Sequence, residues 1–238
     1  MPKTRAAERL IVALDSASIA DARRMVDTLG DSVEFYKIGL VLQLAAGVED
    51  FIRELITQGK KVFLDYKYYD IAATLKKAVH RASQLGVSFL TIHGPAQLIR
   101  GAVEGRGNTS LKLFCVTVLT SLDAGDIAEM GYANHSVEDL VLFRARKALE
   151  AGCDGVIASG QEAKAIRALS PSLLIVTPGI RPDGAAEDDQ KRRTTPAMAI
   201  EAGADYLVVG RPITDVADPR TATNAILVEM QSAFDRLP

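Results

Sequence analysis

Tryptophan is absent from the sequence, and aromatic residues make up only 5% of its 238 positions. This scarcity argues against a surface of stacked rings of the kind that binds single-stranded nucleic acid. An excess of positive charge is also missing, because 28 lysines and arginines are balanced by 30 aspartates and glutamates, for a net charge of −2 with neutral histidines. Such a chain lacks the electrostatic footprint of a protein that binds a phosphate backbone. We therefore expect no nucleic-acid partner.

Long apolar runs and clusters of cysteine are missing as well. No segment approaches the roughly 20 consecutive apolar residues that a membrane helix needs. The N-terminal MPKTRAAERLIVALD has neither the long apolar region nor the cleavage site of a secretory signal peptide. The two cysteines, Cys115 and Cys153, each lie in an apolar run and are too few for a disulfide framework. These absences predict a cytoplasmic protein with two buried thiols and no membrane partner.

What the chain does contain is a series of short β-rich segments separated by segments with helical periodicity. The predicted strands are 10–15, 33–39, 61–67, 87–93, 112–119, 155–159, 173–179 and 206–210. Helical periodicity is clearest at 18–29, 73–85 and 136–152. Left-handed helix ends are expected just before the following strands, at Gly30, Gly59, Gly86 and Gly152. Strict alternation of strand and helix predicts an α/β fold, a (β/α)8 TIM barrel that forms a single domain over 1–238.

Charged residues end the first three predicted strands. Side chains alternate between the two faces of a strand, and this alternation places four charged residues on one common face: Asp15, Lys37, Asp65 and Lys67. Val33 and Phe35 are expected to share that face with Lys37. In a barrel of this kind the strand ends converge at the C-terminal mouth, where enzymes with this fold carry their chemistry. The pattern therefore predicts an active site at the mouth.

The mixture of signs in this cluster favours one kind of chemistry. Buried charges must be paired, so an array of alternating lysine and aspartate can hold them in one small site. Asp65 and Asp70 lie close to Lys67 in the sequence and favour its ammonium form. A protonated lysine cannot act as a Schiff-base nucleophile, but it can stabilise a developing anion and deliver a proton to it. The three histidines are scattered, and no metal-ligand spacing or cofactor motif is found, so neither a metal nor a cofactor is expected.

The loops after the seventh and eighth strands predict a phosphate site. They read TPGIRPDG (177–184) and GRPITDVADP (210–219), and in barrel enzymes these two loops frequently bind phosphate through backbone N–H groups and an arginine. Gly210 and Arg211 fit that role. The basic run at 191–193 is interpreted as a solvated helix start. The connection after the fifth strand, 121–135, is long enough to be a candidate active-site cover.

One segment of the third strand carries a family resemblance. FLDYKYYDIAAT (63–74) resembles the D-x-K-x-x-D-I-x-x-T signature of the orotidine 5′-phosphate decarboxylase family. VALD, YKIG, VTVLTS, TPGIRP and GRPIT follow in the family's order, so the resemblance covers nearly the whole chain. It implies cofactor-free decarboxylation of orotidine 5′-phosphate to uridine 5′-phosphate, in de novo pyrimidine biosynthesis. It also implies a homodimer whose sites are shared between subunits.

Carried over residue by residue, the resemblance implies that Lys67 protonates C6 of the pyrimidine as carbon dioxide leaves. Asp65 would sit beside the substrate carboxylate, and Lys37 would order the array and reach the ribose. Asp70 and Thr74 would reach into the neighbouring subunit's site. The other substrate-binding residues that it implies are Asp15 at the ribose, Thr120 and Ser121 at the ring, Gln190 between ring and phosphate, Arg181, Gly210 and Arg211 at the phosphate, with Ile71 and Pro178 from the same motifs.

Two other functions remain possible at this point. A magnesium-dependent sugar-phosphate decarboxylase or aldolase could use the same barrel, but it needs oxygen ligands for its metal. By resemblance, that subgroup carries an acidic residue near the end of strand two, where this chain has Lys37, a cation that repels a metal. A catalytically silent nucleotide-binding protein is the other possibility. Asp65, Lys67 and Asp70 argue against it, because a pure binder gains little from two carboxylates beside a lysine.

Overall fold

The eight predicted strands are present in the computed structural model of the chain, which describes residues 4–183 and 191–237. The strands are β1 Leu10–Leu14, β2 Phe35–Ile38, β3 Lys61–Tyr68, β4 Phe89–Ile92, β5 Lys112–Val116, β6 Gly155–Ile157, β7 Leu174–Thr177 and β8 Tyr206–Val209. Each pairs in parallel with the next, and β1 pairs with β8 to close the sheet, with Ile11 opposite Val208. The (β/α)8 barrel predicted from the alternation of elements is thereby confirmed.

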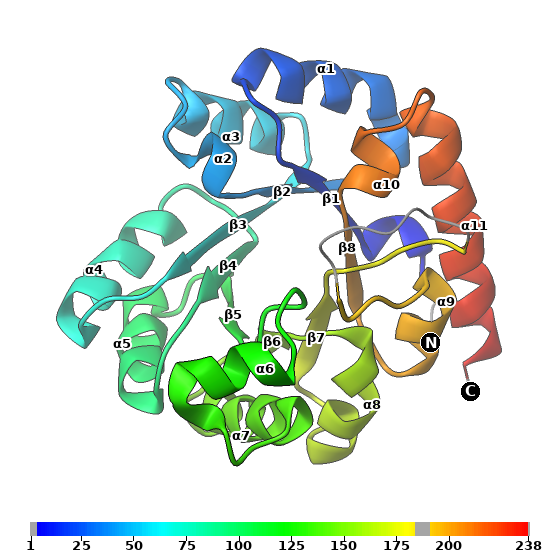
Figure 1. The fold of residues 1–238 in the computed structure, drawn as a ribbon. Helices are drawn as coiled ribbons and strands as arrows, with labels where there is room; N and C mark the ends of the chain where they lie inside the picture. Colours follow the sequence, from blue (N-terminus) through cyan, green and yellow to red (C-terminus); the bar gives the residue numbers. More distant parts are fainter. Residues whose placement is uncertain (1–3, 184–190, 238) are drawn as a thin grey trace.

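Helices surround this closed sheet on its outer face (Figure 1). The longer ones are α1 Ile19–Leu29, α3 Val48–Thr57, α4 Ala72–Ser83, α5 Ala96–Arg106, α7 Val137–Glu150, α8 Gly160–Leu169 and α11 Pro219–Arg236. The shorter ones are α2 Leu40–Gln43, α6 Ala124–Ile127, α9 Pro196–Glu201 and α10 Arg211–Thr214, with a π-helical turn at Ala128–Tyr132. Within the described residues, no helix combines the length and the apolar composition that crossing a bilayer requires.

Local sequence signals account for many helix ends. The backbone N–H of Asp21 donates to the Ser18 hydroxyl at the start of α1, and that of Asp139 donates to Ser136 at the start of α7. The four glycines predicted at helix ends all have positive φ, between 55° and 84°. Only glycine adopts this conformation without a steric cost, so the predicted helix ends are confirmed.

A layer of phenylalanines occupies the barrel interior, together with Ile11, Ala13, Val176 and Val208. Four of the seven phenylalanines of the chain lie there, one from each of four neighbouring strands: Phe35, Phe63, Phe89 and Phe114. The ring of Phe89 is the centre of the layer, with centroids 4.5 Å from Phe114, 4.8 Å from Phe35 and 5.8 Å from Phe63. Edge-to-face and tilted contacts of this kind stabilise a core beyond the area that they bury. The interior is therefore a packed core that supports whatever lies above it at the mouth.

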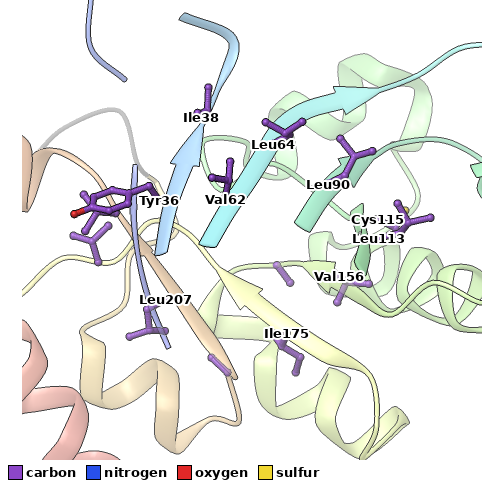
Figure 2. Close-up of a cluster of buried hydrophobic side chains, with 14 of the residues drawn as sticks. Tyr36, Ile38, Val62, Leu64, Leu90, Leu113, Cys115, Val156, Ile175 and Leu207 are labelled. Carbon is purple, nitrogen blue, oxygen red and sulfur yellow. The ribbon is translucent and has the colours of Figure 1, made fainter. Parts of the chain in front are cut away.

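The opposite faces of the strands pack against the helices in a second, larger cluster. Figure 2 shows part of this cluster, with Tyr36, Ile38, Val62, Leu64, Leu90, Leu113, Cys115, Val156, Ile175 and Leu207 labelled. Cys115 and Cys153 are both buried free thiols of this cluster, as the sequence predicts. Val33 also belongs to it, so the expectation that Val33 shares the inner face with Phe35 is wrong. Strand β2 begins only at Phe35, and the alternation of side chains does not extend back to a residue outside the strand.

The basic run at 191–193 also differs from its sequence interpretation. Helix α9 begins later, at Pro196, with Thr195 as its cap. Lys191 is exposed and pairs with Asp123 and Asp126 of the β5–α7 connection, at 2.7 and 2.9 Å. Arg192, in contrast, is only 7% exposed. The run is therefore not a solvated helix start, because its middle residue is directed into the protein while its neighbour remains in water.

Candidate functional site

A cavity of about 360 Å³ opens at the C-terminal mouth of the barrel, above the phenylalanine layer. Its lining residues are Lys37, Leu40, Phe63, Asp65, Lys67, Val116, Val118, Leu119, Thr120, Ser121, Ile157, Pro178 and Val208. Six of them belong to the site predicted from the sequence: Lys37, Asp65, Lys67, Thr120, Ser121 and Pro178. The remaining wall is almost entirely apolar. Such a cavity, mostly apolar with a few polar groups, is typical of a small-molecule site.

The strand periodicity explains why charge collects directly above the phenylalanines. Residues two positions apart on a strand share a face, so each inward phenylalanine is followed by an inward residue one layer higher. Phe35 is followed in this way by Lys37, and Phe63 by Asp65. Lys37 is 8% exposed, and the Asp65 side chain is 16% exposed. The charged layer is thus a product of the same alternation that builds the core.

Four charged side chains form a continuous array of alternating sign. Lys37 Nζ lies 3.2 Å from Asp15 Oδ1 and 3.5 Å from Asp65 Oδ2. Lys67 Nζ donates to Asp65 Oδ1 at 2.9 Å. The convergence of Asp15, Lys37, Asp65 and Lys67 predicted from the strands is therefore present. The array grades from a buried centre to open ends, because the side chains of Asp15 and Lys67 are 54% and 32% exposed.

Asp65 is the electrostatic centre of this array. Burial raises its pKa, but the ammonium groups of Lys37 and Lys67, together with hydrogen bonds from Lys67 and Thr91, act in the opposite direction and hold the pKa of Asp65 below its usual range. Asp65 is consequently an anion at neutral pH. It presents a fixed negative charge at the floor of the cavity, between two lysines.

Thr91 is a site residue that the sequence reasoning missed. It is fully buried on β4, and its hydroxyl donates to Asp65 Oδ1 at 2.9 Å. The backbone N–H of Lys67 donates to the same hydroxyl, also at 2.9 Å. A signal was available, since Thr91 lies two residues after the inward Phe89 and is the one polar residue of β4, which reads FLTI.

Lys67 has an unusual backbone that this hydroxyl helps to hold. Its φ is 47°, and it is the one residue other than glycine with positive φ among residues 4–183 and 191–237. The pairing of β3 with β4 shifts register between Leu64 and Tyr68, so the strand bulges where Lys67 lies. A left-handed lysine costs about 1 to 2 kcal/mol, which surrounding structure must offset. From this backbone conformation the Lys67 side chain contacts that of Asp65, two residues earlier on the same strand.

Gly39 has a steric role in the same array. A Cβ at this position would lie 3.0 Å from Lys37 Nζ and 3.1 Å from Asp15 Oδ1, closer than such contacts normally are. The φ of Gly39 is −105°, so space rather than conformation requires glycine here. The side-chain-free position after β2 allows the Lys37–Asp15 pair to form.

The predicted phosphate residues lie on the opposite side of the mouth from β3. Gly210 connects β8 to α10, and its α-carbon lies near the array, since a Cβ there would be 3.9 Å from Asp15 Oδ2. Arg211 is the exposed first residue of α10. Arg181 is half-buried after β7, and its Nη1 donates to the carbonyl of Ile180 at 2.7 Å. Gln190, predicted to lie between ring and phosphate, is outside the described residues.

Comparison with known proteins places this chain in a family. The family model for the orotidine 5′-phosphate decarboxylase / HUMPS family matches residues 8–226. The chain belongs to this family. A protein from Nitrobacter winogradskyi named orotidine 5′-phosphate decarboxylase is 57% identical over 230 residues, which cover 96% of this chain and 95% of that protein. One of the same name from Rhodopseudomonas palustris strain CGA009 is 51% identical over 227 residues, or 95% of each chain.

Two solved structures superpose on most of the chain. The crystal structure of orotidine 5′-phosphate decarboxylase from Lactobacillus acidophilus superposes with a TM-score of 0.81 at 36% identity, over 93% of this chain and 98% of that one. An uncharacterized conserved protein from Geobacillus kaustophilus gives a TM-score of 0.79 at 30% identity, over 93% and 99% of the two chains. The similarity thus extends over the entire barrel rather than over one motif.

The last part of the family signature is not brought into the cavity. Asp70, Ile71 and Thr74 are all exposed, and none of them lines the cavity at the mouth. The carboxylate of Asp70 instead accepts the backbone N–H of Ile71 at 2.6 Å. Among the described residues of one protomer, the fourth charge of the array is Asp15. The expectation from sequence proximity that Asp70 flanks Lys67 is not met within a single chain.

Metal-binding potential can be judged from the same side chains. Within residues 4–183 and 191–237, no three His, Cys, Asp or Glu side chains gather as metal ligands do. The two carboxylates of the array, Asp15 and Asp65, both face the Lys37 ammonium, at 3.2 and 3.5 Å. That cation occupies the position between them that a divalent metal would need.

Proposed function

We propose that this chain decarboxylates orotidine 5′-phosphate to uridine 5′-phosphate without a cofactor, using Lys67 to stabilise and protonate the carbon that loses carbon dioxide. The observation that supports this most strongly is the array at the mouth, in which Lys67 Nζ lies 2.9 Å from the partly buried Asp65 and lines a mostly apolar cavity. Membership of the family and relatives that carry the decarboxylase name support the same substrate. The reaction belongs to pyrimidine biosynthesis.

The chemistry follows from where the charges stand. As the bond between C6 and the carboxylate breaks, its electron pair stays on C6 and carbon dioxide departs. The ammonium of Lys67 stabilises that developing charge electrostatically and then transfers one of its protons to C6. The neutral amine that remains is reprotonated from water. No electron sink is needed when a fixed cation stabilises the negative charge on C6 in a cavity whose wall is otherwise mostly apolar.

Asp65 acts on the substrate before the bond breaks. In the proposed binding mode its carboxylate lies beside the carboxylate that will leave. Two like charges about 4 Å apart at an effective dielectric of about 20 repel by about 4 kcal/mol before screening. Loss of carbon dioxide removes one of the two charges, so the repulsion is relieved along the reaction. In the free enzyme, Lys37 lowers the energetic cost of holding a charged Asp65, because it pairs with the carboxylate oxygen that Lys67 does not contact.

The phosphate of the substrate binds on the β7 and β8 side of the mouth, across from Lys67 on β3. We assign it to Gly210 and Arg211 on the β8–α10 connection, with Arg181 from the β7 side and Gln190 from the adjoining loop. Thr120 and Ser121 of the cavity wall face the ring, and Asp15 and Lys37 face the ribose. Binding energy from the remote phosphate then contributes to the chemical step by holding the reacting carbon against Lys67.

The magnesium-dependent alternative is disfavoured by the position of Lys37. A hard divalent cation needs several oxygen ligands. Among the described residues, the array at the mouth offers the carboxylates of Asp15 and Asp65. Both already pair with Lys37 Nζ. Binding a metal there would require this buried lysine to leave or to lose its proton.

A homodimer with shared sites is the second part of the proposal. Asp70, Ile71 and Thr74 belong to the family signature but lie exposed beside the mouth. Large apolar side chains are exposed in the same region, with Leu40 at 59%, Tyr69 at 67% and Ile71 at 68%. A symmetric partner that covered this face would bury these side chains and bring its Asp70 and Thr74 toward the neighbouring cavity. We propose that each site is completed in this way.

The direct test is the loss of orotidine 5′-phosphate absorbance in metal-free buffer that contains a chelator. We expect the wild-type protein to convert the substrate completely and at the same rate with and without chelator, because Lys67 rather than a metal meets the charge. Product identity is checked by chromatography against uridine 5′-phosphate. Activity that disappears in chelator and returns with magnesium would reject the cofactor-free mechanism in favour of the metal-dependent one.

Arg211→Ala is expected to weaken binding of phosphorylated ligands. Hydrogen bonds to charged groups contribute about 1.5 to 3 kcal/mol, so the Kd for uridine 5′-phosphate should rise roughly 10- to 100-fold. Titration calorimetry measures it directly. Arg236→Ala is the matched control, since Arg236 is an exposed arginine that pairs with Glu201 at the end of α9, before β8, whereas Arg211 follows β8 at the mouth. Equal affinity in Arg211→Ala and the control would contradict the phosphate assignment.

A further inference from the structure

A buried ion pair lies behind the cavity wall and is not part of the array. Arg192 Nη1 donates to Glu162 Oε1 of α8 at 2.6 Å, and the two side chains are 8% and 7% exposed. Removing two charges from water is costly, and a hydrophobic pair of similar size is often at least as stable. Two further polar atoms of the pair, Glu162 Oε2 and Arg192 Nε, have no hydrogen-bond partner among the described residues. Stability alone therefore does not explain why the pair is there.

The remaining contacts of Arg192 indicate what it holds. Its Nη2 donates to the carbonyls of Val118 and Leu119, at 2.9 and 3.0 Å. Its own backbone N–H donates to the carbonyl of Thr120 at 3.1 Å. One residue thus binds three consecutive carbonyls just beyond the end of β5. Beyond the end of β5 these carbonyls have no neighbouring strand to bond to among the described residues, so Arg192 supplies hydrogen-bond donors to them.

Arg192 is itself fixed in place from the other side. Its carbonyl accepts a hydrogen bond from Ser159 Oγ at 3.1 Å, and Ser159 is the residue that caps α8. Glu162, the partner of the guanidinium, lies one turn further along the same helix. The start of α8 therefore anchors both the backbone and the side chain of Arg192. A planar guanidinium suits this arrangement, because its donors stand in a rigid fork.

The held segment is a wall of the cavity. Val118, Leu119, Thr120 and Ser121 all line it, and so do Lys37, Asp65 and Lys67 of the array. We propose that Arg192 is a positioning residue that sets this wall against the pyrimidine ring, so that the ring stays aligned with Lys67. The inference rests on the proposed function, in which Thr120 and Ser121 face the ring. Arg192 touches no reacting atom and acts through the backbone of the segment that it binds.

The fold contains a matched control for this role. Arg167 also pairs with a carboxylate and binds backbone carbonyls: its Nη2 lies 2.5 Å from Asp205 Oδ2, and its guanidinium donates to Pro171, Leu173 and Gly203. This cluster precedes β7 and β8, so it lies at the end of the barrel away from the mouth. Arg192→Met and Arg167→Met remove the same kind of interaction from opposite ends of one barrel. Both should lower the melting temperature.

Only the Arg192 variant should change the reaction. A displacement of about 1 Å at a reacting centre can cost up to about 100-fold in rate, so we expect kcat/KM of folded Arg192→Met to fall roughly 10- to 100-fold at a temperature well below its melting transition. Arg167→Met should stay within about twofold of wild type, since nothing at the mouth has moved. Arg192→Lys keeps a charge opposite Glu162 without the planar fork; it should regain stability but not the lost rate.

The preference of the site for one pyrimidine ring over another can be measured, and it would not change if Arg192 only stabilised the fold. The Kd for cytidine 5′-monophosphate divided by the Kd for uridine 5′-monophosphate measures the selectivity of the cavity wall between the two pyrimidine rings. We expect this ratio to fall about tenfold in Arg192→Met and Arg192→Lys, and to be unchanged in Arg167→Met. If Arg192→Met does not fold, Arg192→Lys carries the same comparison.

The outcomes separate this inference from the proposed function. A wild-type protein that does not decarboxylate orotidine 5′-phosphate would overturn the proposed function and this inference with it. An active wild type with Arg192 and Arg167 variants that lose stability alike but keep rate and ring discrimination would overturn the positioning role alone. An Arg192→Lys variant with the full wild-type rate would also overturn it, because the fork would then be dispensable.

Discussion

Lys67→Ala should leave a folded barrel with no measurable decarboxylation. The substitution removes both the cation that stabilises the negative charge on C6 and the proton that is transferred to C6. General acid catalysis and electrostatic stabilisation each contribute about 10² to 10⁴ in rate, so we expect a loss of roughly 10⁴-fold or more. The measurement is substrate absorbance under single-turnover conditions in chelator, beside wild type.

Folding should survive this change for reasons visible in the structure. The Lys67 side chain lies above the phenylalanine layer rather than inside it, and it is 32% exposed. Alanine at φ 47° carries about the same backbone strain as lysine, so the substitution adds none. Lys76→Ala is the control, since Lys76 forms an exposed pair with Glu104 on α4 and α5. A Lys67→Ala protein with substantial activity would remove the mechanism proposed here.

Asp70→Asn should also abolish most activity, although Asp70 lies outside the cavity of its own chain. In the proposed dimer its carboxylate completes the partner's array next to Lys67, where loss of the charge leaves that lysine less well oriented. We expect a fall of roughly 10²-fold or more in kcat/KM, comparable to removing one preorganised group from an active site. The monomer fold should be unaffected, because Asp70 is exposed and its one side-chain hydrogen bond within residues 4–183 and 191–237 is with the neighbouring backbone N–H.

Mixing two inactive variants tests whether the sites are shared. A heterodimer of Lys67→Ala and Asp70→Asn holds both defects in one site and none in the other. After unfolding and refolding together, half of the dimers are mixed, and activity should return to about a quarter of wild type.

The control for this mixture is Lys67→Ala with Asp65→Asn. Asp65 and Lys67 contact each other within one chain, so every site of that mixture keeps a defect and no activity should return. Activity that fails to return in the first mixture as well would show that Asp70 serves the site of its own chain.

Much of this protein was determined by sequence patterns of short range. The eight strands, the glycines that end helices and the convergence of Asp15, Lys37, Asp65 and Lys67 could all be predicted, because strand alternation and backbone preference depend on neighbouring residues. The phenylalanine layer and the charged layer above it follow from one period-two pattern on successive strands. The family resemblance of 63–74 lies in the same region and points to the same residues.

Tertiary structure decided the features that depend on register and distant packing. Thr91 joins the array from a strand 26 residues away from Asp65, and Arg192 meets Glu162 and Val118 across 30 and 74 residues. No local pattern distinguishes this buried arginine from the exposed Lys191 beside it. The left-handed backbone of Lys67 likewise arises from a shift in pairing between β3 and β4. A side chain's role is fixed by what the closed sheet brings next to it, and closure is a property of the whole barrel.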